Sequence, residues 1–284
     1  MCCPTDLEPG DYVIVSFDSF VMRRHRAVAL ALCLAGDAVL AQPSQPRPRR
    51  VIEIAAEDEA GEWSRKDGTG FANDIVRAAF GASAVDVRFI VVPYARCKQM
   101  VIDGAVAACF SMSRTGLDSS VVLARSPLFT CYSDYYLRAN EAPRPAGATP
   151  VRAGTVVGVV RGYEYPPSVR TLVDRRVITL EEAPSEAINL QKLAEGRIGA
   201  ALINHNGTKP ASEIVASAGV TGKVKAGPRA GVMGSFLGFS RRHRDVGWAL
   251  AAFNDGLSSI TSTGELARIE ARWARLALSR AGPK

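Results

Sequence analysis

The sequence predicts an α/β protein of two lobes that ends in a pair of helices. Short apolar runs rich in β-branched residues alternate with stretches of helical period from residue 50 onward. A segment rich in Pro, Ala and Gly at 140–150 interrupts this alternation, which resumes at 154. The chain has 284 residues and is 47% hydrophobic, so each lobe can bury a core of its own.

The first half opens with the apolar run VIEIAA at 51–56. A polar loop separates this run from a helix at 71–80, in which Phe71, Ile75, Val76 and Ala79 fall on one face. The other elements expected here are strands at 87–92, 105–112 and 134–139 and a helix that ends at Gly104. Strand, loop and helix in this order are the opening of an α/β unit.

The second half repeats the pattern. Its expected elements are strands at 154–160, 198–204 and 234–240 and helices at 166–175 and 184–196. After residue 245 the sequence is strongly helical. Two amphipathic faces, one containing Trp248 and Phe253 and the other Ile269 and Trp273, are separated at Gly264.

Residues 22–41 have the composition of a secretory signal peptide. Three arginines precede an apolar run at 27–40, and cleavage is expected after Ala41. The run is too short for a spanning helix, so a periplasmic protein without stable membrane insertion is expected. Residues 1–21 then stand before a complete signal, and we interpret them as a spurious N-terminal extension ahead of a start at Met22.

The net charge of +7 does not indicate a nucleic-acid partner. Basic residues gather only at 47–50 and 240–244, and no nucleic-acid-binding module is recognisable. Beyond the signal peptide the cysteines are Cys97, Cys109 and Cys131. In an oxidising compartment this number predicts one disulfide and one buried thiol, and the pairing stays open. No spacing of cysteines and histidines suggests a metal site.

Several segments in order resemble one known family. They are VIEIAAEDEAGEWSRKDGTGFANDIVRAAF, VVPYARCKQMVIDGAVAACFSMSRT, ARSPLF, VRAGTVVGVVRGYEY and LAAFNDGLSSITSTGELARIEARW. This chain resembles the family-3 extracellular solute-binding proteins, the periplasmic amino-acid receptors of ABC transporters, over nearly all of 50–275. The resemblance implies the type II periplasmic-binding-protein fold, in which two lobes, each a mixed sheet flanked by helices, are joined by a two-strand hinge. The first lobe would comprise 50–140 plus 235–284, and the second 145–234.

The same resemblance implies a function. A monomer of this kind captures a small-molecule ligand, amino-acid-like or related, between its lobes and delivers it to an ABC permease, with no cofactor. Two alternatives stay open: a periplasmic dehydratase-like enzyme on the same scaffold, and a ligand-sensing or accessory periplasmic protein. Binding is favoured over catalysis because the sequence shows no nucleophile elbow and no phosphate-binding glycine loop.

Two departures from the family pattern concern the amino-acid clamp. The family places a carboxylate-binding arginine nine residues before the proline that is Pro127 here, and Asp118 stands at that position. Asn204 stands where the family has an aspartate for the ligand ammonium. We therefore expect a ligand with a cationic or hydroxylated end toward Asp118, or an unusual anion held by Arg96 or Arg114.

Other residues are candidates through their position after predicted strands. Glu57 follows the first strand, and Trp63 stands where the family has an aromatic that sandwiches the ligand. The remaining candidates are Ser113, Tyr94, Gly162 and Tyr163. Tyr94 would stack on the ligand, and Gly162 would allow close approach of the backbone. Glu164 is expected to be exposed, and Arg96 and Arg114 have surface roles as alternatives.

Overall fold

The computed structural model describes residues 49–280 except 59, 144, 146 and 147. The predicted signal peptide at 22–41 and the predicted extension at 1–21 lie outside the described residues. Within the described part, no helix is both long and apolar enough to cross a membrane.

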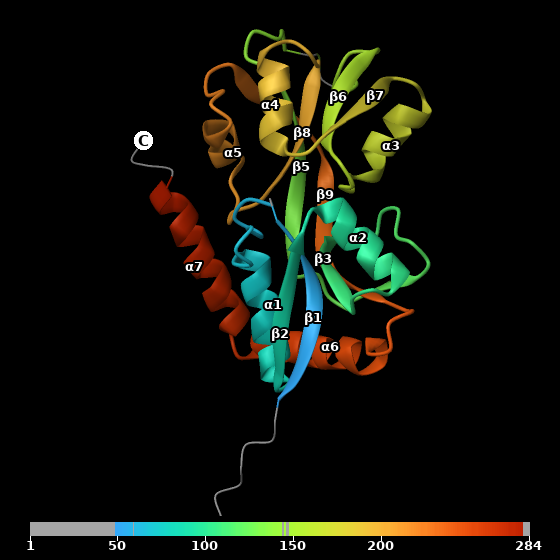
Figure 1. Ribbon diagram of the computed structural model, residues 1–284. Coiled ribbons are helices and arrows are strands. Elements are labelled where there is room, and N and C mark those ends of the chain that lie inside the picture. Colours follow the sequence, from blue (N-terminus) through green and yellow to red (C-terminus); the bar gives the residue numbers. More distant parts are fainter. Residues whose placement is uncertain (1–48, 59, 144, 146–147, 281–284) are drawn as a thin grey trace, which may run out of the picture. The chain divides into compact units, whose positions relative to one another are not determined.

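Strands and helices alternate as expected for an α/β protein (Figure 1). The strands are β1 (Arg50–Glu57), β2 (Val85–Val92), β3 (Ala108–Met112), β4 (Val121–Leu123), β5 (Phe129–Arg138), β6 (Thr155–Val160), β7 (Ile178–Ala183), β8 (Ala200–His205) and β9 (Val224–Ser240). The helices are α1 (Phe71–Ala82), α2 (Tyr94–Asp103), α3 (Pro167–Asp174), α4 (Glu186–Ala194), α5 (Ala211–Ser217), α6 (Val246–Ser262) and α7 (Glu265–Arg280).

The strands form one mixed sheet in the order β2-β1-β3-β9-β5-β8-β6-β7, with β4 paired to β9. β1 is parallel to β2 and β3, and β6 is parallel to β7 and β8. The long strands β5 and β9 pair antiparallel and connect these two parallel groups (Figure 1). The predicted α/β class with two connecting strands is therefore confirmed, while the exact lobe boundaries stay a prediction.

Each parallel group has its own apolar core. Around β1 to β3, helix α1 packs on α6, where the rings of Phe80 and Phe253 lie 5.3 Å apart. Helix α7 is held against α1 because Trp273 Nε1 donates to Asp74 Oδ2 at 2.8 Å. Around β6 to β8, helix α3 covers one core cluster, and α4 and α5 cover another. Two separately packed groups leave a boundary at which a ligand site can form.

Helix α2 is fixed at both ends. It begins directly after Pro93 and ends at Gly104, whose φ of 81° is left-handed and suits glycine. A disulfide joins Cys97 of α2 to Cys109 of β3, and Cys131 is a buried free thiol. The prediction of one disulfide and one buried thiol is therefore confirmed, and the pairing that the sequence left open is Cys97 with Cys109.

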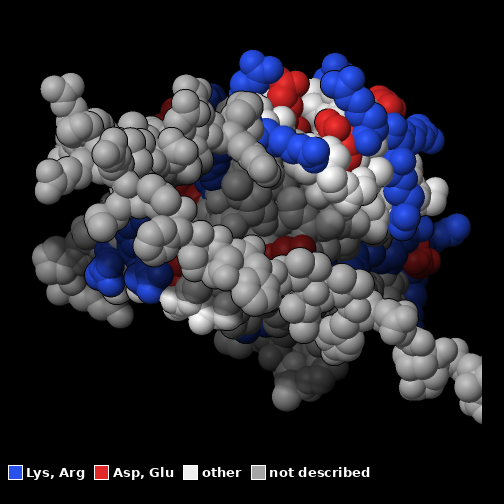
Figure 2. Space-filling view, turned by 90° about the horizontal axis from the view of Figure 1, so that it is seen from below, with Lys and Arg blue, Asp and Glu red and all other residues white. Residues whose placement is uncertain are grey.

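Charged side chains of both signs are interspersed on the described part of the face in Figure 2. Surface ion pairs among the described residues include Arg49 with Asp86 at 3.3 Å and Arg170 with Asp174 at 2.8 Å. Exposed pairs of this kind contribute little to stability.

Candidate functional site

A small, partly open cavity lies where residues from both parallel groups meet. Its volume is about 30 Å³, room for about two waters. The residues that line it are Glu57, Trp63, Tyr94, Ser111, Ser113, Cys131, Tyr163, Glu164, Asn204, Met233, Gly234 and Ser235. A second pocket of about 210 Å³ shares Glu57 and Tyr94 with this cavity and extends along Asp58, Pro93, Ala95, Val160, Arg161 and Pro184. We call them the inner cavity and the outer pocket.

Three aromatic side chains form walls of the inner cavity. Tyr94 begins α2 and meets Tyr163 of the β6–α3 loop edge to face, with ring centres 5.3 Å apart. Trp63 comes from the loop between β1 and α1 and packs on Phe129 at 4.8 Å. Its indole Nε1 donates to Asn206 Oδ1 at 3.0 Å across the site. Rings held in this way present their faces and edges to whatever occupies the cavity.

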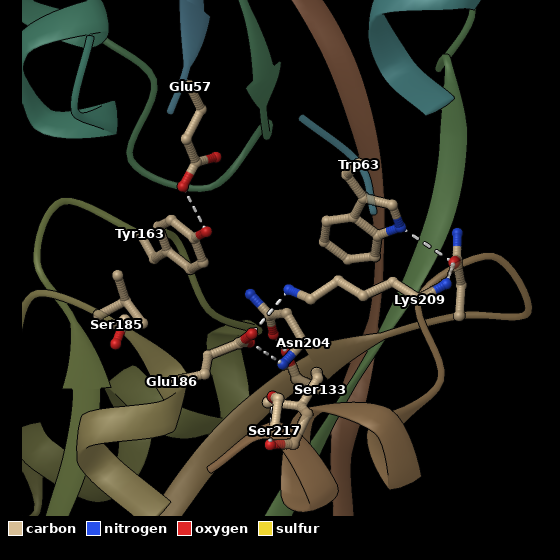
Figure 3. A network of polar contacts seen from close by, with 12 residues as sticks. Glu57, Trp63, Ser133, Tyr163, Ser185, Glu186, Asn204, Lys209 and Ser217 are labelled. Carbon is tan, nitrogen blue, oxygen red and sulfur yellow. Dashed lines mark hydrogen bonds and ion pairs between the residues drawn. The ribbon is translucent and has the colours of Figure 1, made fainter. Parts of the chain in front are cut away.

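Glu57, the last residue of β1, is a buried carboxyl group of the inner cavity. Its side chain is only 4% exposed, and the hydroxyl of Tyr163 donates to its Oε1 (Figure 3). Burial raises the pKa of Glu57 to about 8, against the lowering effects of the Tyr163 hydrogen bond and of the Lys209 charge. Glu57 is therefore largely protonated at neutral pH in the unliganded protein.

This raised pKa predicts a pH dependence of stability. Between pH 4.5 and about 8, folded Glu57 keeps a proton that the unfolded chain releases, so the free energy of unfolding falls as pH rises through this window. Glu57→Gln removes the titration and should flatten that part of the curve. Urea unfolding at several pH values measures both proteins. Equal slopes for wild type and variant would contradict the assignment.

Glu164 closes another side of the cavity through a cross-site network. Its Oε1 lies 2.7 Å from Lys98 Nζ, and its Oε2 accepts from the Tyr94 hydroxyl at 2.8 Å. The side chain is 11% exposed, so the expectation that Glu164 is exposed was wrong. Lys98 also donates to the carbonyl of Gly162 at 3.1 Å. Burial raises the pKa of Glu164, and the charge of Lys98 opposes this rise.

A buried ion pair between Lys209 and Glu186 lies next to residues of the inner cavity (Figure 3). Lys209 Nζ lies 2.6 Å from Glu186 Oε2, and the two side chains are only 4% and 7% exposed. The other oxygen of Glu186 accepts from the backbone N–H of Asn204 at 2.7 Å. The ammonium of Lys209 also lies 4.3 Å from the centre of the Trp63 ring. The ion pair therefore fixes both an aromatic wall and the end of β8.

Two serine hydroxyls in the inner cavity have no protein partner. The oxygens of Ser111 and Ser235 are buried, and neither makes a hydrogen bond within the described part of the chain. Ser111 has a φ of 69°, unusual for a residue other than glycine, at an irregular part of β3. Buried hydroxyls normally find a partner, and outliers of this kind gather at binding sites. These two hydroxyls can therefore donate to or accept from a molecule bound in the cavity.

The structure brings six of the predicted residues to the inner cavity: Glu57, Trp63, Tyr94, Ser113, Tyr163 and Asn204. Gly162 lies beside it with a φ of 83°, and a Cβ there would come within 3.1 Å of the Cα of Ala95. The backbone at Gly162 therefore packs closely against α2. The sequence analysis expected this glycine to allow close approach to a ligand instead.

The remaining three predicted residues do not line the inner cavity. Asp118 is exposed, and the N–H and hydroxyl of Ser120 donate to it at 2.8 and 2.6 Å, which lowers its pKa. The exposed guanidinium of Arg114 lies 4.7 Å from the Phe236 ring, and Arg96 is exposed on α2. We therefore leave these three residues out of the site proposed below.

Sequence reasoning missed several cavity residues. Ser111 stands two positions before the predicted Ser113, but its backbone irregularity is not encoded in any recognisable motif. Ser235 falls in an expected strand without any polar pattern to single it out. The Lys209–Glu186 pair joins residues 23 positions apart, and neither charge has a distinctive local context.

The comparisons with known proteins agree with this architecture. No family model and no curated protein matches the sequence. A histidine kinase sensor domain with similarity to periplasmic binding proteins superimposes with a TM-score of 0.65 at 19% identity, covering 79% of this chain and 96% of that chain. The chain has the periplasmic-binding-protein fold.

Two further structures share this fold. An ancestral arginine-binding protein bound to arginine has a TM-score of 0.63 and 16% identity, over 79% of this chain and 98% of that chain. An ancestral amino-acid-binding protein, a precursor of cyclohexadienyl dehydratase, has a TM-score of 0.58 and 15% identity, over 78% of this chain and 94% of that chain. Identities this low support the shared fold, and the function has to be argued from the site.

Proposed function

We propose that this protein is a periplasmic solute-binding protein that holds a small polar organic molecule in the inner cavity and delivers it to an ABC permease. The observation that carries the proposal is the pair of buried, unpartnered hydroxyls of Ser111 and Ser235 in a cavity walled by aromatic rings. Small-molecule sites combine apolar walls with a few placed polar groups in this way. A ligand larger than two waters can enter only if the cavity opens. A hinge motion, in which the two parts separate and then close around the ligand, would provide this opening.

A thermal-shift screen of the full chain, refolded to remove any carried-over ligand, tests the proposal. The panel comprises amino acids, amines, sugars and carboxylates. A micromolar binder at millimolar concentration stabilises the folded state by about 4 kcal/mol and raises the midpoint clearly. The recovered compound should be chemically unchanged. A compound that is consumed would support the dehydratase-like alternative, in which the protonated Glu57 would serve as an acid.

Ser235→Ala tests whether the ligand occupies the inner cavity. Loss of one hydrogen bond from a buried hydroxyl should weaken binding about 3- to 10-fold. Ser262→Ala is the matched control, because Ser262 is exposed at the end of α6, away from the inner cavity, and its hydroxyl donates to the carbonyl of Ser259. Calorimetric titration with the tightest compound measures both variants. Silence across the whole panel, or unchanged affinity in Ser235→Ala, would contradict the proposal.

A further inference from the structure

Two carboxylates at or beside the inner cavity are paired with lysines, and Glu57 is not. Glu164 pairs with Lys98 at 2.7 Å, and Glu186 pairs with Lys209 at 2.6 Å. Glu57 has no ion pair with any residue that the structure describes, and its recorded side-chain contact is the Tyr163 hydroxyl. Ionised Glu57 would therefore leave the site with one uncompensated negative charge.

The rest of the lining also suits a cation. Ring faces attract ammonium groups, and the rings of Trp63 and Tyr94 already lie 4.3 and 5.7 Å from the ammonium groups of Lys209 and Lys98. The ring of Tyr163 has no such lysine contact among the described residues, so it is the aromatic wall available to a ligand ammonium. No lysine or arginine is among the described residues that line the inner cavity, so a carboxylate on the carbon next to the ammonium would find no cationic partner there. Arg161 lines the outer pocket, where it pairs with Glu182 at 3.5 Å. The hydroxyls of Ser111 and Ser235 accept hydrogen bonds from N–H groups as readily as they donate.

We propose that the ligand is a small organic amine without an α-carboxylate, bound as its ammonium ion with the carboxylate of Glu57 as its partner. This inference rests on the proposed binding function and narrows its ligand class. The ammonium group enters the inner cavity, and the carbon chain extends past Glu57 and Tyr94 into the outer pocket. A charge-assisted hydrogen bond to Glu57 and contacts to the rings together favour this orientation.

Binding is coupled to a proton. Protonated Glu57 and a ligand ammonium combine to give an ion pair, and the carboxyl proton passes to solvent. The titratable and charged groups around Glu57 are Asp58, Tyr94, Arg161, Tyr163, Glu164, Glu186 and Lys209. Burial raises the pKa of both tyrosines, which are neutral in this pH range. Glu164 is paired with Lys98, Glu186 with Lys209 and Arg161 with Glu182. Amine affinity should therefore rise about tenfold per pH unit from pH 6 to about 8, while the amine itself stays charged.

Matched trios of compounds test the ligand class. Leucine, 3-methylbutylamine and 4-methylpentanoate share one side chain, as do phenylalanine, phenethylamine and 3-phenylpropionate. Calorimetric titration of the full chain at pH 7, in two buffers of different ionisation enthalpy, measures affinity and proton release together. At least one amine should bind tenfold or more tightly than its amino acid and its acid, with release of most of one proton.

Glu57→Gln and Asp118→Asn form the matched pair of variants. Glu57→Gln keeps an acceptor for Tyr163 but should weaken amine binding at pH 8 at least tenfold and abolish proton release. Asp118→Asn changes an exposed carboxylate outside the inner cavity and should bind amines as wild type does.

The outcomes separate this inference from the proposed function. Preference for the amino acids or the acids, or wild-type amine affinity in Glu57→Gln, overturns the amine assignment and leaves a binding protein. Failure of every compound in the broad screen and the trios overturns both.

Discussion

Lys209→Met is expected to lower the free energy of unfolding by about 3–5 kcal/mol. The methionine keeps apolar contact with Trp63, but Glu186 is left as a buried carboxylate without its cation. Desolvating an unpaired charge accounts for a loss of this size. Urea unfolding, followed by circular dichroism at constant pH, measures the change.

The double variant Lys209→Met with Glu186→Gln provides the control. Glutamine still accepts from the N–H of Asn204, and no buried charge remains. The double variant should recover at least half of the stability that the single variant loses, because the two sites are directly coupled. Additive losses, or a single-variant loss below about 1 kcal/mol, would show that the pair does not stabilise the fold.

Removal of the disulfide is the second change with a large expected effect. Cys97 and Cys109 are 12 positions apart and join α2 to β3. A disulfide that closes a loop of this length lowers the conformational entropy of the unfolded chain and so stabilises the fold by about 3 kcal/mol. The double variant Cys97→Ala with Cys109→Ala should therefore lower the free energy of unfolding by that amount. Tyr94 begins the same helix, so ligand affinity should fall as well.

Two controls distinguish the effect of breaking the disulfide from the effect of removing a buried sulfur atom: treatment with reductant, and the variant Cys131→Ala. Wild type treated with reductant should lose stability to the same degree, and the double alanine variant should not respond. Cys131 is a buried thiol, and burial raises its pKa to about 11, so it is unreactive at neutral pH. Cys131→Ala should cost about 1 kcal/mol and keep the response to reductant. Insensitivity of wild type to reductant would contradict a stabilising disulfide.

Local sequence patterns predicted most of the fold because they encode local structure. The apolar run at 51–56 forms most of β1, and Gly104 ends α2 as expected. The expected strand at 234–240 is only the final part of β9, which begins at Val224. Its first ten residues contain Gly, Pro and basic residues, which have low strand propensity, and their pairing with β5 is a long-range contact.

The site could be predicted where a side chain follows a strand end or, for Trp63, where the family pattern places an aromatic residue. Glu57, Tyr94 and Tyr163 were found in this way, since strand ends and the loops after them meet at the ligand site. Asp118 was favoured from the family pattern, although the serine two positions later marks a local turn that occupies its carboxylate. The raised pKa of Glu57 depends on burial by residues from distant segments, which no local pattern reveals.

A crystal structure of the chain with its most tightly bound amine tests the central claim most directly. The ligand nitrogen should lie about 3 Å from a carboxylate oxygen of Glu57 and within about 6 Å of the centre of the Tyr163 ring. The hydroxyl of Ser111 or Ser235 should gain a hydrogen bond to the ligand. A ligand bound elsewhere, with the inner cavity and these hydroxyls unchanged, would contradict the account.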